Sequence, residues 1–230
     1  MVMDEQSHIV DSFDQELKKI EQAMLEMAGL AGDQLTQAIR ALFSGDLEEA
    51  KSVIASDKEI DALEARIDDV SVRVIALRQP MAQDLRSIVA AMKIANDLER
   101  IGDYGKSIAR RTEILVDERP IKSAEKAIKR IGKLVVAMLT DVMDAYVARD
   151  VGKALEVRVR DEEVDEMHDA LLRELLTYMM EDPRNITASM HLLFMAKMLE
   201  RAGDHVTNVA EQVNYLITGE ILDDDVRPGN

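Results

Sequence analysis

The chain has 230 residues, 45 of them acidic and 29 basic, which gives a formal net charge of −16 at pH 7. This balance argues against duplex DNA or RNA as a partner, because phosphate neutralisation needs clustered Lys and Arg, and it suits metal cations or a basic protein surface better. The absence of cysteine excludes disulfides, thiolate nucleophiles and Cys-ligated zinc.

The chain opens on an acidic, polar stretch from Met1 to Ile20 that lacks the basic start and apolar run of a signal peptide. Nowhere do 18 apolar residues run together, so no transmembrane helix is expected. These features predict a soluble, cytoplasmic protein.

Apolar residues recur at helical spacing through most of the chain, and only 4 prolines and 10 glycines interrupt it. Asp46 with Glu49 resembles a capping box. Pro80 breaks one helix and can open the next at its first position, as can Pro183 after a capping Asp182. The predicted helices run from about Asp4 to Phe43, Leu47 to Arg78, Met81 to Leu115, Lys122 to Arg149, from the turn at 150–152 to Met180, and from Asn185 to Thr218, where Gly219 stops the last one.

The sequence repeats itself. Residues 56–61 resemble residues 160–165 at an offset of 104, and residues 98–103 resemble residues 199–204 at an offset of 101. We therefore predict an all-α protein built from a duplicated unit of three helices. Its predicted parts are a first repeat at 1–116, a second repeat at 117–219 and an acidic tail at 220–230 that is expected to be disordered.

Each repeat carries two pairs of acidic residues spaced i, i+4, which places both members of a pair on one helical face. If the helices fold back at Pro80, Asp57 and Asp103 are level, each 23 residues from the turn. The same argument holds about Asp182 and Pro183. The sequence thus predicts one four-carboxylate patch per hairpin, formed by Asp57, Asp61, Glu99 and Asp103 in the first and by Asp161, Asp165, Glu200 and Asp204 in the second.

Four crowded carboxylates repel one another and resist ionisation, so something must compensate their charge. Hard cations are one answer, because Mg, Ca and Mn prefer carboxylate oxygens and Fe accepts them. Two readings without metal stay open at this point: a solvated acidic face, and ion pairs with Arg100 and Arg201. Gly102 and Gly203, each directly before a motif aspartate, would allow a close approach of helices or ligand.

The histidines fit a di-iron enzyme poorly. His168 follows Asp165 by three residues, but its counterpart in the first repeat is Glu64, so the Glu-x-x-His pattern of ferritin-like sites is not duplicated. We interpret His168 and His205 as surface residues rather than ligands. No phosphate-binding glycine loop or catalytic triad is present in the sequence.

Five stretches of the sequence form a distinctive combination: Arg78-Gln79-Pro80, Asp84-Leu85-Arg86, Leu98-Glu99-Arg100-Ile101-Gly102-Asp103, Thr177-Tyr178-Met179-Met180-Glu181-Asp182 and Glu200-Arg201-x-Gly203-Asp204. Together they resemble the PhoU family of bacterial phosphate-transport accessory proteins. The resemblance extends from residues 13–17 to about Gly219. One departure is Ala202, which stands where the first copy has Ile101.

The resemblance implies two three-helix bundles related by pseudo-twofold symmetry, with metal ions or clusters (Mg, Mn, Fe or Zn) on the acidic motifs. It also implies a negative regulator of the phosphate-starvation response and of phosphate uptake, not an enzyme. Its expected partners are the ATPase subunit of the phosphate ABC transporter and a sensor histidine kinase, with the membrane reached only through them. A homodimer is left open. The alternatives are a carboxylate-bridged metalloenzyme of di-iron type and a metal-free helical scaffold.

Overall fold

Helices joined by short turns make up residues 2–118 and 120–222, the part of the chain that the computed structural model describes, and this part contains no β-strand. Six long helices account for almost all of it, and the predicted fold class is confirmed. The elements are α1 (Val2–Ser44), α2 (Leu47–Arg78), α3 (Gln83–Ala109), the single turn α4 (Thr112–Leu115), α5 (Lys122–Ala148), α6 (Val151–Glu181), the short 3₁₀ helix η1 (Pro183–Asn185) and α7 (Ile186–Thr218).

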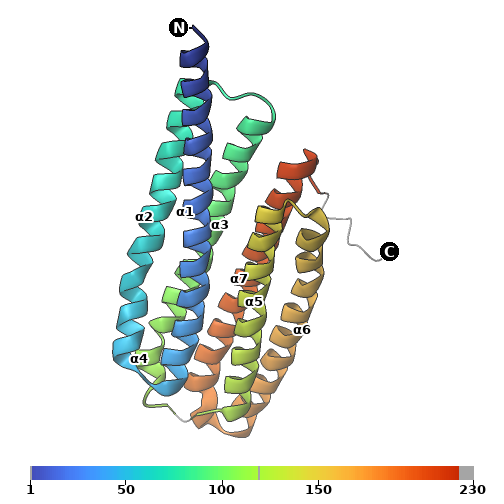
Figure 1. Cartoon of the computed structure of the whole chain (residues 1–230). Coiled ribbons are helices and arrows are strands. Elements are labelled where there is room, and N and C mark those ends of the chain that lie inside the picture. Colours follow the sequence, from blue (N-terminus) through green and yellow to red (C-terminus); the bar gives the residue numbers. More distant parts are fainter. Residues whose placement is uncertain (1, 119, 223–230) are drawn as a thin grey trace.

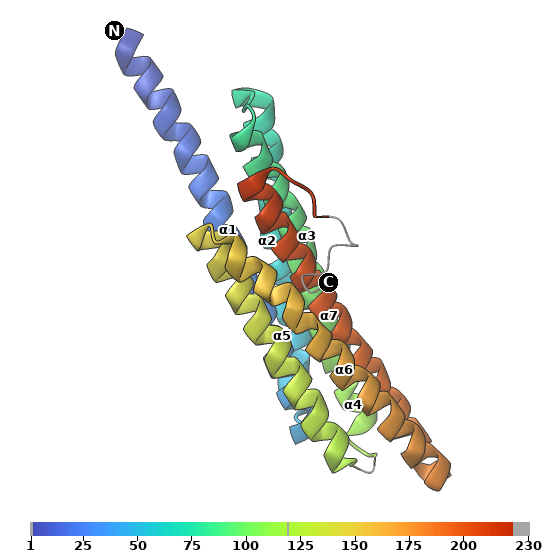
Figure 2. The same cartoon turned by 90° about the vertical axis from the view of Figure 1, so that its right-hand side faces the viewer.

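The long helices form two three-helix bundles that lie side by side (Figure 1). Helices α1, α2 and α3 pack on one another, as do α5, α6 and α7, and the bundles meet through α3 against α7 and α1 against α5. The α2–α3 turn and the α6–α7 turn lie at opposite ends of the molecule (Figures 1 and 2). This is the arrangement expected of two repeats related by a pseudo-twofold axis.

Matching residues of the two repeats touch where that axis passes between α3 and α7. Tyr104 and His205 are separated by the repeat offset of 101, and their ring centroids lie 5.8 Å apart. Only residues near a twofold axis can contact their own counterparts. The contact therefore places the axis at the α3–α7 interface.

The core follows from the apolar stripe that each helix turns inward. In α1, Met24, Met27, Ala31, Leu35 and Ala38 are all fully buried, at spacings of three, four, four and three residues. The long helices therefore bury one continuous face each and hold their polar motifs at fixed heights along the bundle.

Capping residues begin and end the helices largely as predicted. Asp46 accepts hydrogen bonds from the backbone N–H of Glu48 and Glu49. The Glu49 side chain does not complete the capping box, because it pairs with Arg40 instead, whose Nε lies 2.7 Å from Glu49 Oε1. Gly219 ends α7 in the left-handed conformation, with φ of 80°.

The predicted third helix, Met81 to Leu115, was wrong at both ends. It begins at Gln83, because Gln79 and Ala82 have positive φ values of 49° and 46° and cannot belong to a right-handed helix. Pro80 therefore does not occupy a first helical position. The helix ends at Ala109, and the short helix α4 follows after a tight turn in which Arg111 N–H bonds to Ile108 C=O.

The remaining boundaries agree with prediction to within two residues, including the start of α1. The predicted disordered tail lies outside the described residues from position 223 onward, and the predicted repeat boundary at residues 116 and 117 stays a prediction. Over residues 2–118 and 120–222, no helix is both long and apolar enough to cross a membrane.

Candidate functional site: two carboxylate clusters

The second cluster brings together the four carboxylates predicted for the α6–α7 hairpin. Asp161 and Asp165 on α6 face Glu200 and Asp204 on α7 closely enough that neighbouring carboxylates help to raise the pKa of each of the three aspartates. In the described part of the chain, Asp161 Oδ1 and Glu200 Oε2 are buried and have no hydrogen-bond partner. Lys197 Nζ, 2.6 Å from Glu200 Oε1, is the cation that contacts this cluster.

Ionisation is correspondingly unfavourable there. Burial, with the nearby charges of Asp165, Asp204 and Glu200, raises the pKa of Asp161 to about 7. Burial and neighbouring carboxylates also raise the pKa of Asp165 and Asp204. Burial and mutual repulsion disfavour the charged carboxylates. A cation that bound among them would therefore lower the free energy of the cluster.

Gly203 makes room for this arrangement. A Cβ atom at this position would lie 2.6 Å from Asp161 Oδ1. Its counterpart Gly102 serves packing instead, since a Cβ there would lie 2.8 Å from Ile60 Cδ1. The expectation that both glycines allow a close approach is confirmed, with a carboxylate as the neighbour in one repeat and a core side chain in the other.

The first cluster is organised around Asp57, which is 3% exposed. Lys106 Nζ forms a short ion pair with Asp57 Oδ2 and lies 3.3 Å from Asp103 Oδ1. Gln34 Nε2 donates to Asp57 Oδ1 at 3.2 Å. The aspartate therefore has both a charged and a neutral donor from its own chain, and Lys106 neutralises two of the predicted ligands at once.

Glu99 is the group of the first cluster with a poorly compensated charge. Burial and the adjacent Asp103 carboxylate raise its pKa to about 7. Within the described residues, its buried Oε2 atom accepts no hydrogen bond, and Arg100 Nε lies 3.4 Å from it. The predicted pairing of Arg100 with neighbouring acids is thus present, at long distances that give a weak interaction.

Asp61 is the exposed member of the predicted set, whereas Asp57, Glu99 and Asp103 are buried or partly buried. Lys106 links Asp57 to Asp103, and the Asp103 carboxylate acts on Glu99. The place of Asp61 in this cluster stays a prediction.

Two residues outside the acidic motifs explain why the clusters differ. At an offset of 101, Lys106 corresponds to Thr207. At an offset of 104, Gln34 corresponds to Met138, which is fully buried. The second repeat therefore lacks both donors that satisfy Asp57. Lys106 could have been suspected from its position three residues after Asp103, but no local pattern connects Gln34 to Asp57.

The donor chemistry of the second cluster fits an oxygen-preferring cation, because its buried carboxylate oxygens lack protein partners. The side chains are not arranged as a finished site, however. Across residues 2–118 and 120–222, no three His, Asp or Glu side chains converge as metal ligands would. Metal binding by the eight carboxylates stays a prediction.

His168 and His205 are both less exposed than the prediction of surface residues implied. His205 was expected at the surface, but it lies partly buried between α3 and α7, where its Nδ1 is 2.8 Å from Asp97 Oδ1. His168 Nδ1 lies 3.4 Å from Asp169 Oδ1, with a side chain that is 17% exposed. His205 thus belongs to the contact between the repeats.

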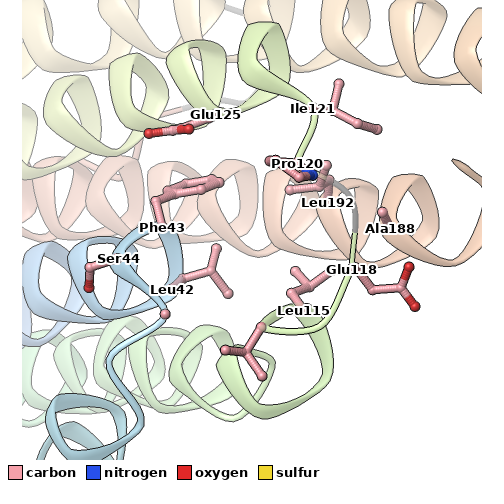
Figure 3. A pocket seen from close by; sticks show the side chains of 12 residues that line it. Leu42, Phe43, Ser44, Leu115, Glu118, Pro120, Ile121, Glu125, Ala188 and Leu192 are labelled. Atoms are coloured by element: carbon pink, nitrogen blue, oxygen red, sulfur yellow. The ribbon is translucent and has the colours of Figure 1, made fainter.

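A separate apolar pocket of about 320 Å³ lies at the base of the molecule, away from both clusters. Phe43 and Leu42 of α1 line it together with Leu192 of α7, and the linker at Pro120 crosses it (Figure 3). None of the eight predicted carboxylates lines this pocket. It marks imperfect packing where the linker joins the two bundles.

Comparison with known proteins gives consistent matches over nearly the whole chain. A family model described as the PhoU domain matches residues 24–112 and again residues 128–213. A protein of Caulobacter vibrioides named phosphate-specific transport system accessory protein PhoU homolog is 48% identical over 215 residues, which is 94% of either chain.

Two solved structures share the fold. The crystal structure of PhoU from Pseudomonas aeruginosa is 40% identical, has a TM-score of 0.86, and covers 90% of this chain and 100% of that one. The phosphate transport system regulatory protein PhoU from Streptococcus pneumoniae is 32% identical, has a TM-score of 0.85, and covers 92% of this chain and 99% of that one. The similarity includes both repeats, so it applies to the two-bundle architecture as a whole.

Proposed function

Because the chain belongs to the PhoU family, we propose that it is a negative regulator of the phosphate-starvation response and of phosphate uptake. It acts in the cytoplasm as an adaptor between the ATPase subunit of the phosphate ABC transporter and a sensor histidine kinase. It restrains the kinase when phosphate is plentiful, and it reaches the membrane only through these partners.

The observation that carries this proposal is similarity over nearly the whole chain to proteins whose names give an accessory or regulatory role in phosphate transport. The Caulobacter relative is named an accessory protein of phosphate-specific transport, and the Streptococcus protein is named a regulatory protein of the phosphate transport system.

Deletion of the gene tests the regulatory part. Expression of a phosphate-starvation reporter should rise under phosphate excess and return to its basal level when the wild-type gene is supplied again. An unchanged reporter in the deletion strain would refute this role. Co-purification of a tagged chain with the transporter ATPase and with the kinase, each in a strain lacking the other, tests the adaptor part.

The protein is proposed to lack catalytic activity. The rival interpretation, a carboxylate-bridged di-iron enzyme, requires histidine ligands beside the acids, and the four histidines do not repeat with the motifs. Iron-reconstituted protein should consume no more oxygen than the same amount of iron in buffer. Oxygen consumption that disappears in an Asp161→Asn/Glu200→Gln variant would favour the enzyme.

We further propose that the second cluster binds a metal cation more strongly than the first cluster does. Oxygens of Asp161, Asp165, Glu200 and Asp204 would hold Mg, Mn, Fe or Zn, and the bound cation would cancel the repulsion between α6 and α7. Asp57, Asp61, Glu99 and Asp103 would hold a cation more weakly, because Lys106 already supplies a positive charge to Asp57 and Asp103.

Elemental analysis of protein purified without chelator or affinity metal tests whether the second cluster binds metal more strongly than the first. Wild-type protein should retain metal, an Asp161→Asn/Glu200→Gln variant should lose most of it, and the matched Asp57→Asn/Glu99→Gln variant should retain it. Wild-type protein without metal would leave the regulatory proposal standing and refute the metal part. The metal-free scaffold would then be the better description of the chain.

A further inference from the structure

The first half of α7 carries a row of large apolar side chains on its exposed face. Ile186, Met190 and Phe194 are 46%, 41% and 50% exposed, and their spacing of four residues places them on one side of the helix. The row extends for about 12 Å along α7, at a rise of about 1.5 Å per residue. Apolar side chains grouped in this way on a surface mark a contact with another molecule, whereas single exposed ones need no explanation.

Arg111, in the turn between α3 and α4, borders this row and has an incomplete set of partners. Its guanidinium carbon lies 5.6 Å from the centre of the Phe194 ring, and its Nη1 donates to the Ser107 backbone oxygen at 2.6 Å. Its Nε atom is buried without a hydrogen-bond partner among the described residues, and burial lowers the pKa of the side chain. With the residues that the structure describes, Arg111 forms no ion pair. A carboxylate brought to the guanidinium would therefore supply a counter-charge that these residues do not provide.

Further positive charges continue this surface. Lys197 and Arg201 are exposed on the face of α7 that carries the apolar row. Lys197 Nζ lies 2.6 Å from Glu200 Oε1, whereas Arg201 forms no ion pair within the described part of the chain. Arg110, directly before Arg111, is exposed as well. The apolar row is therefore bordered by cations, in a chain whose net charge is −16.

The matching surface of the first repeat has the opposite charge. It is a hollow of about 450 Å³, whose charged lining consists of one lysine and four acids: Lys93, Glu64, Asp68, Asp97 and Glu211. At the repeat offset of 101, Lys93 stands in place of Phe194, and Glu211 stands in place of Arg110. The combination of an apolar row with cations thus occurs on one side of the pseudo-twofold only. A partner that is selected by this combination would not bind the matching surface.

We propose that this surface of α7 docks an acidic amphipathic helix of a partner protein, an inference that rests on the adaptor role proposed above. The apolar face of that helix lies against Ile186, Met190 and Phe194, as an amphipathic helix lies on an apolar surface in other complexes. A carboxylate at the edge of the docked helix binds the guanidinium of Arg111, whose planar donors suit a carboxylate.

The chemistry of the surface selects this occupant over others. A small anion would bind the cations but leave the apolar row exposed to water, and an apolar segment without acids would leave Arg111 without a counter-charge. A basic segment would be repelled by Arg110, Arg111 and Arg201. A helix with acids beside its apolar face meets both requirements, and an aromatic and an arginine at the centre are typical anchors of such a contact.

Binding to the two purified partners tests the surface. The probes are the ATPase subunit of the transporter and the cytoplasmic part of the kinase, and wild-type protein should bind at least one of them. Phe194→Ser should weaken that binding at least about 30-fold, because it removes the central aromatic anchor. The matched variant Lys93→Ser changes the corresponding position of the first repeat and should weaken binding less than about twofold.

A cross-link identifies what lies on the apolar row. A photoreactive phenylalanine in place of Met190 should attach to a segment of the bound partner that has apolar residues at helical spacing and acidic residues beside them. Arg111→Glu should weaken binding at least about tenfold, because it opposes like charges. A partner variant with lysine in place of the acids of the cross-linked segment should bind Arg111→Glu protein more tightly than wild-type protein.

Circular dichroism should show unchanged helicity in all three variants, since Phe194 and Lys93 are exposed and Arg111 is partly buried. Phe194→Ser protein that binds both partners as tightly as wild type would overturn the docking site and leave the adaptor role standing. A cross-linked segment that is basic, or that belongs to a second copy of this chain, would also overturn it. Wild-type protein that binds neither partner would overturn the docking site together with the adaptor role, while the deletion phenotype still decides the regulatory role.

Discussion

Asp57 in α2 and Asp161 in α6 occupy matching positions of the two repeats, and they differ in what lies beside them. Asp57 receives a hydrogen bond from Gln34 and an ion pair from Lys106. Asp161 has Met138 and Thr207 at the corresponding positions, and within the described residues its Oδ1 atom has no hydrogen-bond partner. At this matching position, therefore, the protein compensates the aspartate in the first bundle and leaves the aspartate of the second bundle without the corresponding donors.

This difference shows that an acidic motif alone does not determine how the charge of its carboxylates is compensated. The motif places carboxylates on a helical face, but residues on the other helices decide whether their charge is already compensated. A protein cation and a metal ion compete for the same carboxylate oxygens. We therefore expect the two clusters to respond differently to mutation, metal and pH.

Removal of the internal cation should have the largest effect. Lys106→Met leaves Asp57 buried without a charged partner, and the free energy of unfolding at pH 7 should fall by about 3 kcal/mol. Thr207→Met at the matching position of the second repeat should change it by less than about 0.5 kcal/mol. Urea unfolding measures both, and equal effects would show that the two clusters are electrostatically alike.

Metal should stabilise the molecule through the second cluster. At a free Mn²⁺ concentration 100-fold above the dissociation constant, linkage predicts a gain of about 2.7 kcal/mol. Thr207→Lys would place a cation beside Asp204, as Lys106 lies beside Asp103, and should abolish most of this gain. Thermal unfolding with and without Mn²⁺ checks it, and a full metal effect in Thr207→Lys would exclude the second cluster as the binding site.

Stability should also depend on pH through Asp161. Its pKa of about 7 in the folded protein lies above its ordinary value of 3.8, so the folded state holds the proton more tightly. Metal-free protein should therefore lose stability as pH rises from about 4 to about 7. Asp161→Asn should remove part of this slope and, allowing for partial solvent exposure, stabilise the protein at pH 8 by about 1 to 2 kcal/mol.

Glu99 and Asp57 supply the controls for that experiment. Glu99, whose pKa is also raised to about 7, should account for much of the remaining slope, which Glu99→Gln would reduce. Asp57→Asn should instead destabilise the protein, because Lys106 loses the more buried of its two carboxylate partners. Stabilisation by Asp57→Asn equal to that of Asp161→Asn would contradict the proposed difference between the clusters.

The smallest effects should come from the two glycines. Gly102→Ala directs a methyl group at Ile60, which is 1% exposed, and should cost about 1 kcal/mol of stability. Gly203→Ala meets the movable end of Asp161, so stability should change little while metal affinity falls. Calorimetric unfolding and metal titration of both variants separate these outcomes.

Much of the architecture followed from local sequence signals. The apolar spacing predicted six long helices, and Asp46, Asp182 and Gly219 end or begin helices as expected. The repeat offsets and family motifs predicted the two bundles. The start of α3 could not be predicted in this way, because a proline can open a helix, and only the backbone shows that Gln79 and Ala82 have positive φ.

The electrostatic character of the clusters and the place of His205 were decided by tertiary structure. Helix periodicity and capping depend on residues within about four positions of one another, so the sequence by itself determined where the helices and the acidic pairs lie. Asp57 is compensated by Gln34, 23 residues before it, and by Lys106, 49 residues after it. Charge compensation depends on distance in space, and only the packing of α1, α2 and α3 brings these three residues together.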